Sequence, residues 1–299
     1  MIRWIRNSDL DLSHRYKFKK AIVITLAGNI FLAIAKSIAA YFSNSTAIYA
    51  DAINSISDVL YSILLAVGLW ISQKPPDISH PQGHGRFEPL AALFITISMG
   101  IAGGEALRAS INRFMSGGAS IKIDFYGIAL LLSVLIKAIM YWIIHNIGNQ
   151  LSSPGLQAAA KDNISDVATS LAAIVGIFGS NLINPLFDPI AGILVSFWIF
   201  KNVWQSAKTN LGYLTGAGAD PGLRQKILNS VINIDGVKNV HHIITDYAGP
   251  RLVVEMHINA DGDITLDQAH ELCDEATRLL ENLPEVDRAY VHKEPLGHD

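Results

Sequence analysis

The chain has 299 residues, a mean hydropathy of +0.31 and only 16% charged residues, whereas a soluble domain carries about 25%. The net charge of −3 gives no indication of nucleic-acid binding, and the single Cys273 excludes an internal disulfide or a cluster of cysteine ligands. The acidic residues gather in the last part of the chain: from Thr215 onward there are 15 acidic and 7 basic residues. We therefore expect an apolar, basic-flanked membrane domain at 1–211 and an acidic C-terminal domain at 212–299.

Six apolar segments follow one another, and each is long enough to cross a bilayer, which takes about 20 mainly apolar residues. The expected helices cover residues 21–42, 47–71, 89–114, 125–147, 156–182 and 185–207. Basic residues crowd the N-terminal tail, which places that tail on the cytoplasmic side. An even number of spans then places the C-terminal domain in the cytoplasm too, as in a multi-pass protein of the cell inner membrane.

The C-terminal domain is predicted to be small and α+β. An amphipathic helix starts after Pro221, and two strands at 240–247 and 252–259 flank a turn at Ala248-Gly249-Pro250. Thr265 and Gln268 have the spacing of a capping box, which opens a second helix before a last strand at 288–292. The order α-β-β-α-β suggests a ferredoxin-like sandwich.

Two of the predicted spans contain paired oxygen side chains. Asn54 and Asp58 in the second span, and Asp162 and Asp166 in the fifth, are four residues apart and so share a helix face. At 1.5 Å per residue, Asp58 and Asp166 both lie roughly 15–17 Å into the bilayer. A carboxylate at that depth costs about 2.5–3.5 kcal/mol, so a function is expected. A divalent cation would remove the repulsion between the carboxylates, and protons would replace it when it leaves.

The alternative is a structural role in which these acids form ion pairs with Lys161, Lys36 or Lys137. Asp51 shares a face with Asp58, seven residues further on, and is a secondary candidate ligand. Asp51 is also placed where a helix-start residue would stand.

Three motifs resemble the cation diffusion facilitator family: ADAINSISD at 50–58, HPQGHGRFEP at 80–89 and KDNISD at 161–166. The resemblance spans the whole chain. It implies six transmembrane helices, a metallochaperone-like cytoplasmic tail, and a homodimeric antiporter that exports a divalent metal ion in exchange for protons. It also implies that Asn54, Asp58, Asp162 and Asp166 form the transport site.

The transport site lacks histidine, as in the manganese-type members that the chain resembles more closely. An all-oxygen site suits Mn²⁺ or Fe²⁺, while Zn²⁺ favours nitrogen and sulfur ligands, although oxygen ligands also bind Zn²⁺. We expect Mn²⁺ as the transported ion, with Zn²⁺ or Fe²⁺ as alternatives, and no organic cofactor.

Two accessory metal sites match family positions. One is Asp77, His80 and His84, in the loop after the second span, where the alternative is simple solvation. The other is in the tail, with the candidate ligands His241, His257, His292, Glu294 and His270. Lys293 lies between two of these ligands and disfavours a highly charged cluster of ions.

Two other functional classes are less well supported. A non-transporting membrane metal sensor or scaffold would not need the intact ligands of both spans. An intramembrane metalloenzyme is not expected, because His270-Glu271-Leu272-Cys273-Asp274 begins like a zinc-protease motif but lacks its second histidine. The chain is therefore predicted not to be an enzyme.

Overall fold

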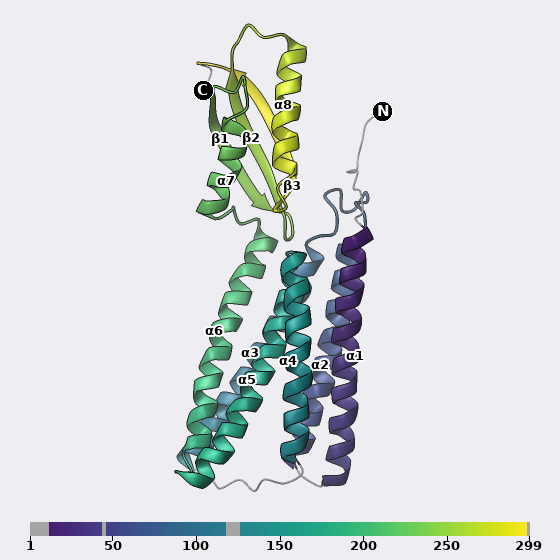
Figure 1. The fold of residues 1–299 in the computed structure, drawn as a ribbon, viewed down its shortest axis with the longest axis vertical. Coiled ribbons are helices and arrows are strands. Elements are labelled where there is room, and N and C mark those ends of the chain that lie inside the picture. The colour runs from purple at the N-terminus through teal and green to yellow at the C-terminus, as the bar shows by residue number, and fades with distance from the viewer. Residues whose placement is uncertain (1–11, 44–45, 118–125, 298–299) are drawn as a thin grey trace. The chain divides into compact units, whose positions relative to one another are not determined.

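A computed structural model describes residues 12–43, 46–117 and 126–297. Within these ranges the chain forms eight helices and three strands, divided between two compact units, Met1–Asn210 and Leu211–Asp299 (Figure 1).

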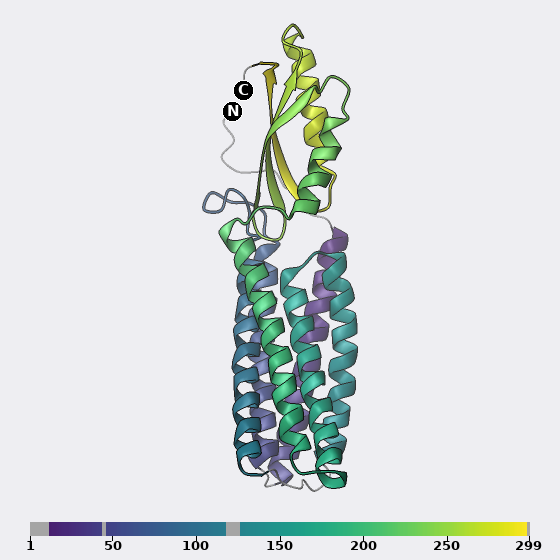
Figure 2. The same cartoon turned by 90° about the vertical axis from the view of Figure 1, so that its left-hand side faces the viewer.

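The first unit is a bundle of long helices that run alongside one another (Figures 1 and 2). Its helices are α1 (Leu12–Ser43), α2 (Thr46–Ser72), α3 (Phe87–Met115), α4 (Tyr126–Gln150), α5 (Pro154–Leu182) and α6 (Phe187–Thr215). Among the described residues, α1 to α4 each contain a stretch long and apolar enough to cross a membrane. Helices α5 and α6 are 29 residues long, also enough to cross a bilayer at 1.5 Å per residue, and both contain charged residues. The expected helical membrane domain is confirmed.

Packing in the bundle places α4 against both α5 and α1, and α3 against α2 and α5. The buried core includes Leu65, Leu69, Ile95, Met99 and Ile144. At Gly68 an added Cβ would lie 2.4 Å from the Cβ of Ala91, so α2 and α3 touch where only glycine fits. Other large apolar side chains stay exposed, as expected for helices whose solvent is lipid.

A buried polar contact fixes the start of α5, the helix that carries two of the candidate ligands. Ser153 caps α5 by accepting a hydrogen bond from the backbone N–H of Leu156, and Pro154 follows at the first helical position. The Ser153 hydroxyl donates in turn to the buried carboxylate of Glu88, at the start of α3. A carboxylate also suits the positive end of the α5 dipole.

The second unit follows the predicted order, with α7 (Pro221–Ile232), β1 (Asn239–Tyr247), β2 (Leu252–Ala260), α8 (Leu266–Glu281) and β3 (Val286–Pro295). Strand β2 is central, antiparallel to β1 and parallel to β3. The helices cover one face of the sheet (Figure 2), where Leu252, Val254, Met256 and Ile258 form the core. Period-two alternation leaves the opposite face of β2 polar. The predicted α+β fold is confirmed, as is the capping box of Thr265 and Gln268.

Candidate metal centre

Three carboxylates from α2 and α5 converge inside the helical bundle. One oxygen each of Asp58, Asp162 and Asp166 lies within 4.8 Å of the other two. Oxygen ligands on opposite sides of one ion are about 4–5 Å apart, twice a metal–oxygen distance of about 2.0–2.6 Å. The three carboxylates therefore lie close enough to share one ion after small shifts.

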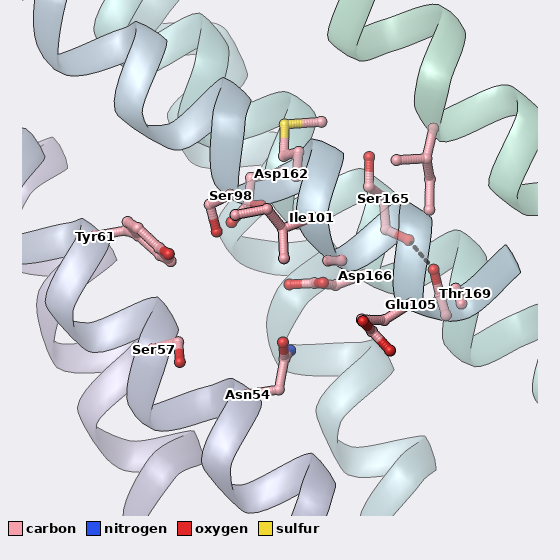
Figure 3. A pocket seen from close by; sticks show the side chains of 14 residues that line it. Asn54, Ser57, Tyr61, Ser98, Ile101, Glu105, Asp162, Ser165, Asp166 and Thr169 are labelled. Carbon is pink, nitrogen blue, oxygen red and sulfur yellow. Dashed lines mark hydrogen bonds between the residues drawn. The ribbon is translucent and has the colours of Figure 1, made fainter. Parts of the chain in front are cut away.

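The fourth predicted ligand lines the same space. Asn54, on α2, borders a cavity of about 330 Å³ together with Asp162 and Asp166 of α5. Figure 3 shows the side chains of Asn54 and Asp166 directed into this cavity from the two helices. Five hydroxyl-bearing side chains also line it: Ser57, Tyr61, Ser98, Ser165 and Thr169. The wall is thus rich in oxygen, which suits a partly hydrated hard cation.

A buried lysine also reaches the carboxylates. Nζ of Lys137, on α4, lies 2.9 Å from Oδ2 of Asp58 and 2.7 Å from Oδ2 of Asp166. The first contact is a hydrogen bond, and the second is an ion pair without hydrogen-bond alignment. Lys137 is one of the lysines considered as an ion-pair partner of these acids, and it does pair with two of them. With three carboxylates and one ammonium the centre has a formal charge of −2, which one divalent ion neutralises.

Glu105 is a lining residue that the sequence reasoning missed. It lies on α3, borders the cavity with Asn54 and Asp166, and has an exposed side chain directed toward it (Figure 3). The signal was present, because a glutamate 18 residues into an apolar helix calls for the same explanation as the other acids. The secondary candidate Asp51 lies on α2, outside the residues whose side chains the structure describes.

The loop between α2 and α3 brings its three predicted ligands together. One ligand atom each of Asp77, His80 and His84 lies within 4.8 Å of the others. His84 Nε2 is 3.3 Å from Asp77 Oδ2, and the two imidazole rings are 4.6 Å apart. His84 is buried, yet its Nδ1 has no hydrogen-bond partner within the described residues. The hydrogen bond from the His80 backbone N–H lowers the pKa of Asp77, which keeps the carboxylate charged.

In the C-terminal unit, a β-bulge gathers histidines on the open face of the sheet. The pairing of β1 with β2 shifts by one residue between Val240 and His242, so His241 is an extra residue in β1. As a result both His241 and His242 lie beside His257 of β2, with ring separations of 5.7 and 4.5 Å. In β3, His292 pairs with His257 and their rings are 5.1 Å apart.

Two overlapping sets of ligands result, and both use His257. In one set a ligand atom each of His241, His257 and Glu294 lies within 4.8 Å of the others; in the other set the partners are His242 and Glu255. Glu255 was missed from sequence, although it precedes His257 by two residues and so lies on the same face of β2. Both sets provide the imidazole and carboxylate ligands that transition metals accept.

Two expectations for the tail need correction. His270 lies away from the histidine face, because α8 covers the opposite, apolar side of the sheet; its Nε2 is 3.5 Å from Asp274 of the same helix. Lys293 pairs in register with the core residue Ile258, and its Nζ donates to the backbone oxygen of Asp261. Its charge therefore does not stand between His292 and Glu294.

Comparison with known proteins places this geometry in a family. Residues 22–215 match the cation efflux transmembrane domain, and residues 219–296 match the cation efflux protein cytoplasmic domain. An uncharacterized transporter of Methanocaldococcus jannaschii is 34% identical over 275 residues, which cover 92% of this chain and 97% of that protein. The manganese efflux system protein MneS of Bacillus subtilis is 26% identical, covering 94% of this chain and 96% of that protein.

A solved structure of MamM-CTD is 22% identical, covers 26% of this chain and 98% of that chain, and has a TM-score of 0.25. The two family matches together span nearly all of the chain, and the expected family is thereby confirmed. The chain belongs to the cation efflux family of membrane transporters that move metal ions.

Proposed function

We propose that this protein exports a divalent metal ion, Mn²⁺ above all, from the cytoplasm in exchange for protons. The observation that carries the proposal is the convergence of Asp58, Asp162 and Asp166 within 4.8 Å, beside a cavity that Asn54 also lines. Two antiparallel helices contribute the ligands, so a small relative movement of α2 and α5 would expose the ion to one side or the other.

The ligand chemistry supports manganese over zinc. Asparagine and aspartate supply oxygen only, and hydroxyls or water would complete the six-fold coordination that Mn²⁺ accepts. Zinc favours imidazole and thiolate, which the transport site lacks. The similarity to MneS, a protein described by its name as a manganese efflux system, is in line with this choice. Fe²⁺ and Zn²⁺ remain the alternative transported ions.

Proton exchange follows from the charges that the ion leaves behind. When the metal departs, the carboxylates stand within contact distance in a medium of low dielectric constant, where like charges repel strongly. Lys137 offsets one negative charge, and protons from the opposite side of the membrane would offset the rest. Each cycle would then move metal outward and protons inward.

The arrangement in the cell is part of the same proposal. The transmembrane domain (1–211) would lie in the cell inner membrane with both termini cytoplasmic, and the cytoplasmic domain (212–299) would join two chains into a homodimer. The loop ligands Asp77, His80 and His84 and the tail ligands around His257 would then sense cytoplasmic metal. Metal bound at the tail would shift the equilibrium of the relative movement of α2 and α5 that exposes the ion to one side or the other.

The experiment is transport by the purified full-length protein in sealed vesicles with an imposed pH gradient. We expect Mn²⁺ to accumulate when the gradient is present, and Fe²⁺, Zn²⁺ and Cd²⁺ to compete with decreasing strength. A collapse of accumulation when a proton carrier dissipates the gradient would support exchange. A protein that binds metal without any accumulation would instead be the membrane sensor or scaffold.

A further inference from the structure

The buried lysine of α4 contacts two of the three converging carboxylates. Lys137 Nζ lies 2.9 Å from Asp58 Oδ2 and 2.7 Å from Asp166 Oδ2, and the Lys137 side chain is 5% exposed. Because α4 packs along α5, the ammonium is held at the carboxylates by the helix packing itself. Lys137 thereby links the α2 ligand to the α5 ligand.

An ammonium and a metal ion require the same oxygen lone pairs. A hard cation bonds an oxygen at about 2.0–2.6 Å, while an ammonium donates to it at about 2.7–2.9 Å. A metal ion between Asp58 and Asp166 would therefore meet Nζ at close range. Two positive charges so near each other inside the helical bundle, where the dielectric constant is lower than in water, repel strongly. For a metal to bind both Oδ2 atoms, the ammonium has to withdraw from them.

We propose that Lys137 is an intramolecular competitor of the transported ion. Its ammonium bridges Asp58 and Asp166 when no metal is bound and withdraws when metal enters. The inference rests on the proposed function, since it concerns the same site. Lys137 is then the residue that keeps metal affinity low enough for release and returns the ligands to a paired state after each cycle.

The competition predicts opposite effects on binding and on turnover. A neutral side chain at 137 would leave the ligand oxygens without an internal cation, so metal would bind more tightly. Release would become slower for the same reason, because no ammonium takes the place of the leaving ion. In transport assays, KM and the maximal rate should therefore both fall. A residue that only supported the fold would weaken binding when replaced, and KM would rise.

The test is Mn²⁺ binding to the purified full-length protein, measured by competition with a fluorescent chelator at fixed pH. Lys137→Met and Lys137→Gln remove the charge with side chains of similar length, and each should lower the dissociation constant of the transport site about tenfold. Lys137→Arg keeps a cation that donates to both carboxylates, and its affinity should equal or fall below that of the wild type. If Lys137→Met does not fold, Lys137→Gln gives the same answer.

The matched control is Lys161→Met. Lys161 precedes Asp162, is half-buried, and makes no ion pair among the described residues. Its replacement removes a positive charge near the site without breaking a lysine–carboxylate ion pair. The dissociation constant for Mn²⁺ should therefore change less than about threefold. An equal tightening in both variants would mean that net charge rather than competition sets the affinity, and would overturn the proposal.

Asp58→Ala separates this inference from the proposed function. If Asp58→Ala abolishes transport-site binding while both neutral variants at 137 bind Mn²⁺ no more tightly than the wild type, the competitor role is wrong and the transport site stands. If Asp58→Ala leaves binding intact, the transport site itself is wrong. Tighter binding with slower turnover in Lys137→Met and Lys137→Gln is the result that the competitor role requires.

Discussion

The centre in the helical bundle and the histidine face of the C-terminal sheet offer a metal ion different ligands. In the bundle, Asp58, Asp162 and Asp166 supply oxygen only, and a buried ammonium lies against them. On the sheet, His241, His242 and His257 present imidazole on the face opposite the one that α7 and α8 cover. The bundle centre, which we propose releases its ion during transport, is lined by oxygen atoms and holds an internal ammonium. The tail site, which we propose senses the ion, is open and rich in nitrogen.

The two regions should therefore respond to different substitutions. The largest expected effect comes from replacing a ligand of the bundle centre. We expect Asp58→Ala to lower pH-driven Mn²⁺ transport in vesicles by about 100-fold or more, since ligand loss exceeds the 10–100-fold cost of losing a supporting residue. Lys137 keeps its contact with Asp166, so the fold should persist. Metal binding by the tail should be unchanged; transport near the wild-type rate would refute the bundle centre.

The second prediction addresses the sheet. His257 belongs to both tail ligand sets, so His257→Ala should weaken Zn²⁺ binding at the tail about 100-fold or more, since it removes a ligand rather than a supporting residue. The measurement is titration of the full-length protein in the Asp58→Ala background, which removes the transport site. His270→Ala is the matched control, because α8 holds that histidine on the other side of the sheet. Equal losses in the two variants would contradict the assignment of the ligands.

A third substitution would blur the difference between the regions by bringing nitrogen into the bundle. Asn54 lines the cavity with Asp162 and Asp166, and Asn54→His should shift the transport preference toward Zn²⁺, which favours imidazole. We expect the ratio of Zn²⁺ to Mn²⁺ transport to rise about tenfold in competition assays, the effect of about 1.4 kcal/mol. An unchanged ratio would show that Asn54 does not contact the ion.

The bundle centre was more accessible to sequence reasoning than the sheet. Residues four apart on a helix share a face in any packing, so Asp162 and Asp166 could be paired without a structure. The contact of Lys137 with these carboxylates could not be foreseen, because it depends on how α4 packs against α5.

On the sheet, a one-residue bulge in β1 decides which histidines meet, and no local pattern marks it. Sequence reasoning named His241 and His257 correctly as neighbours but missed Glu255. That residue precedes His257 by two residues on the same strand face and forms the second ligand set with His242 and His257. His270 was misplaced because its helix could have covered either face.

The central claim is that oxygen atoms of α2 and α5 hold the transported ion. The most direct measurement is manganese X-ray absorption on the full-length protein carrying His84→Ala and His257→Ala, which disable the loop and tail sites. We predict one Mn²⁺ per chain with oxygen ligands only and no imidazole scattering, and loss of this ion when Asp166→Ala is added. Imidazole around the bound manganese, or an ion that survives Asp166→Ala, would contradict the account.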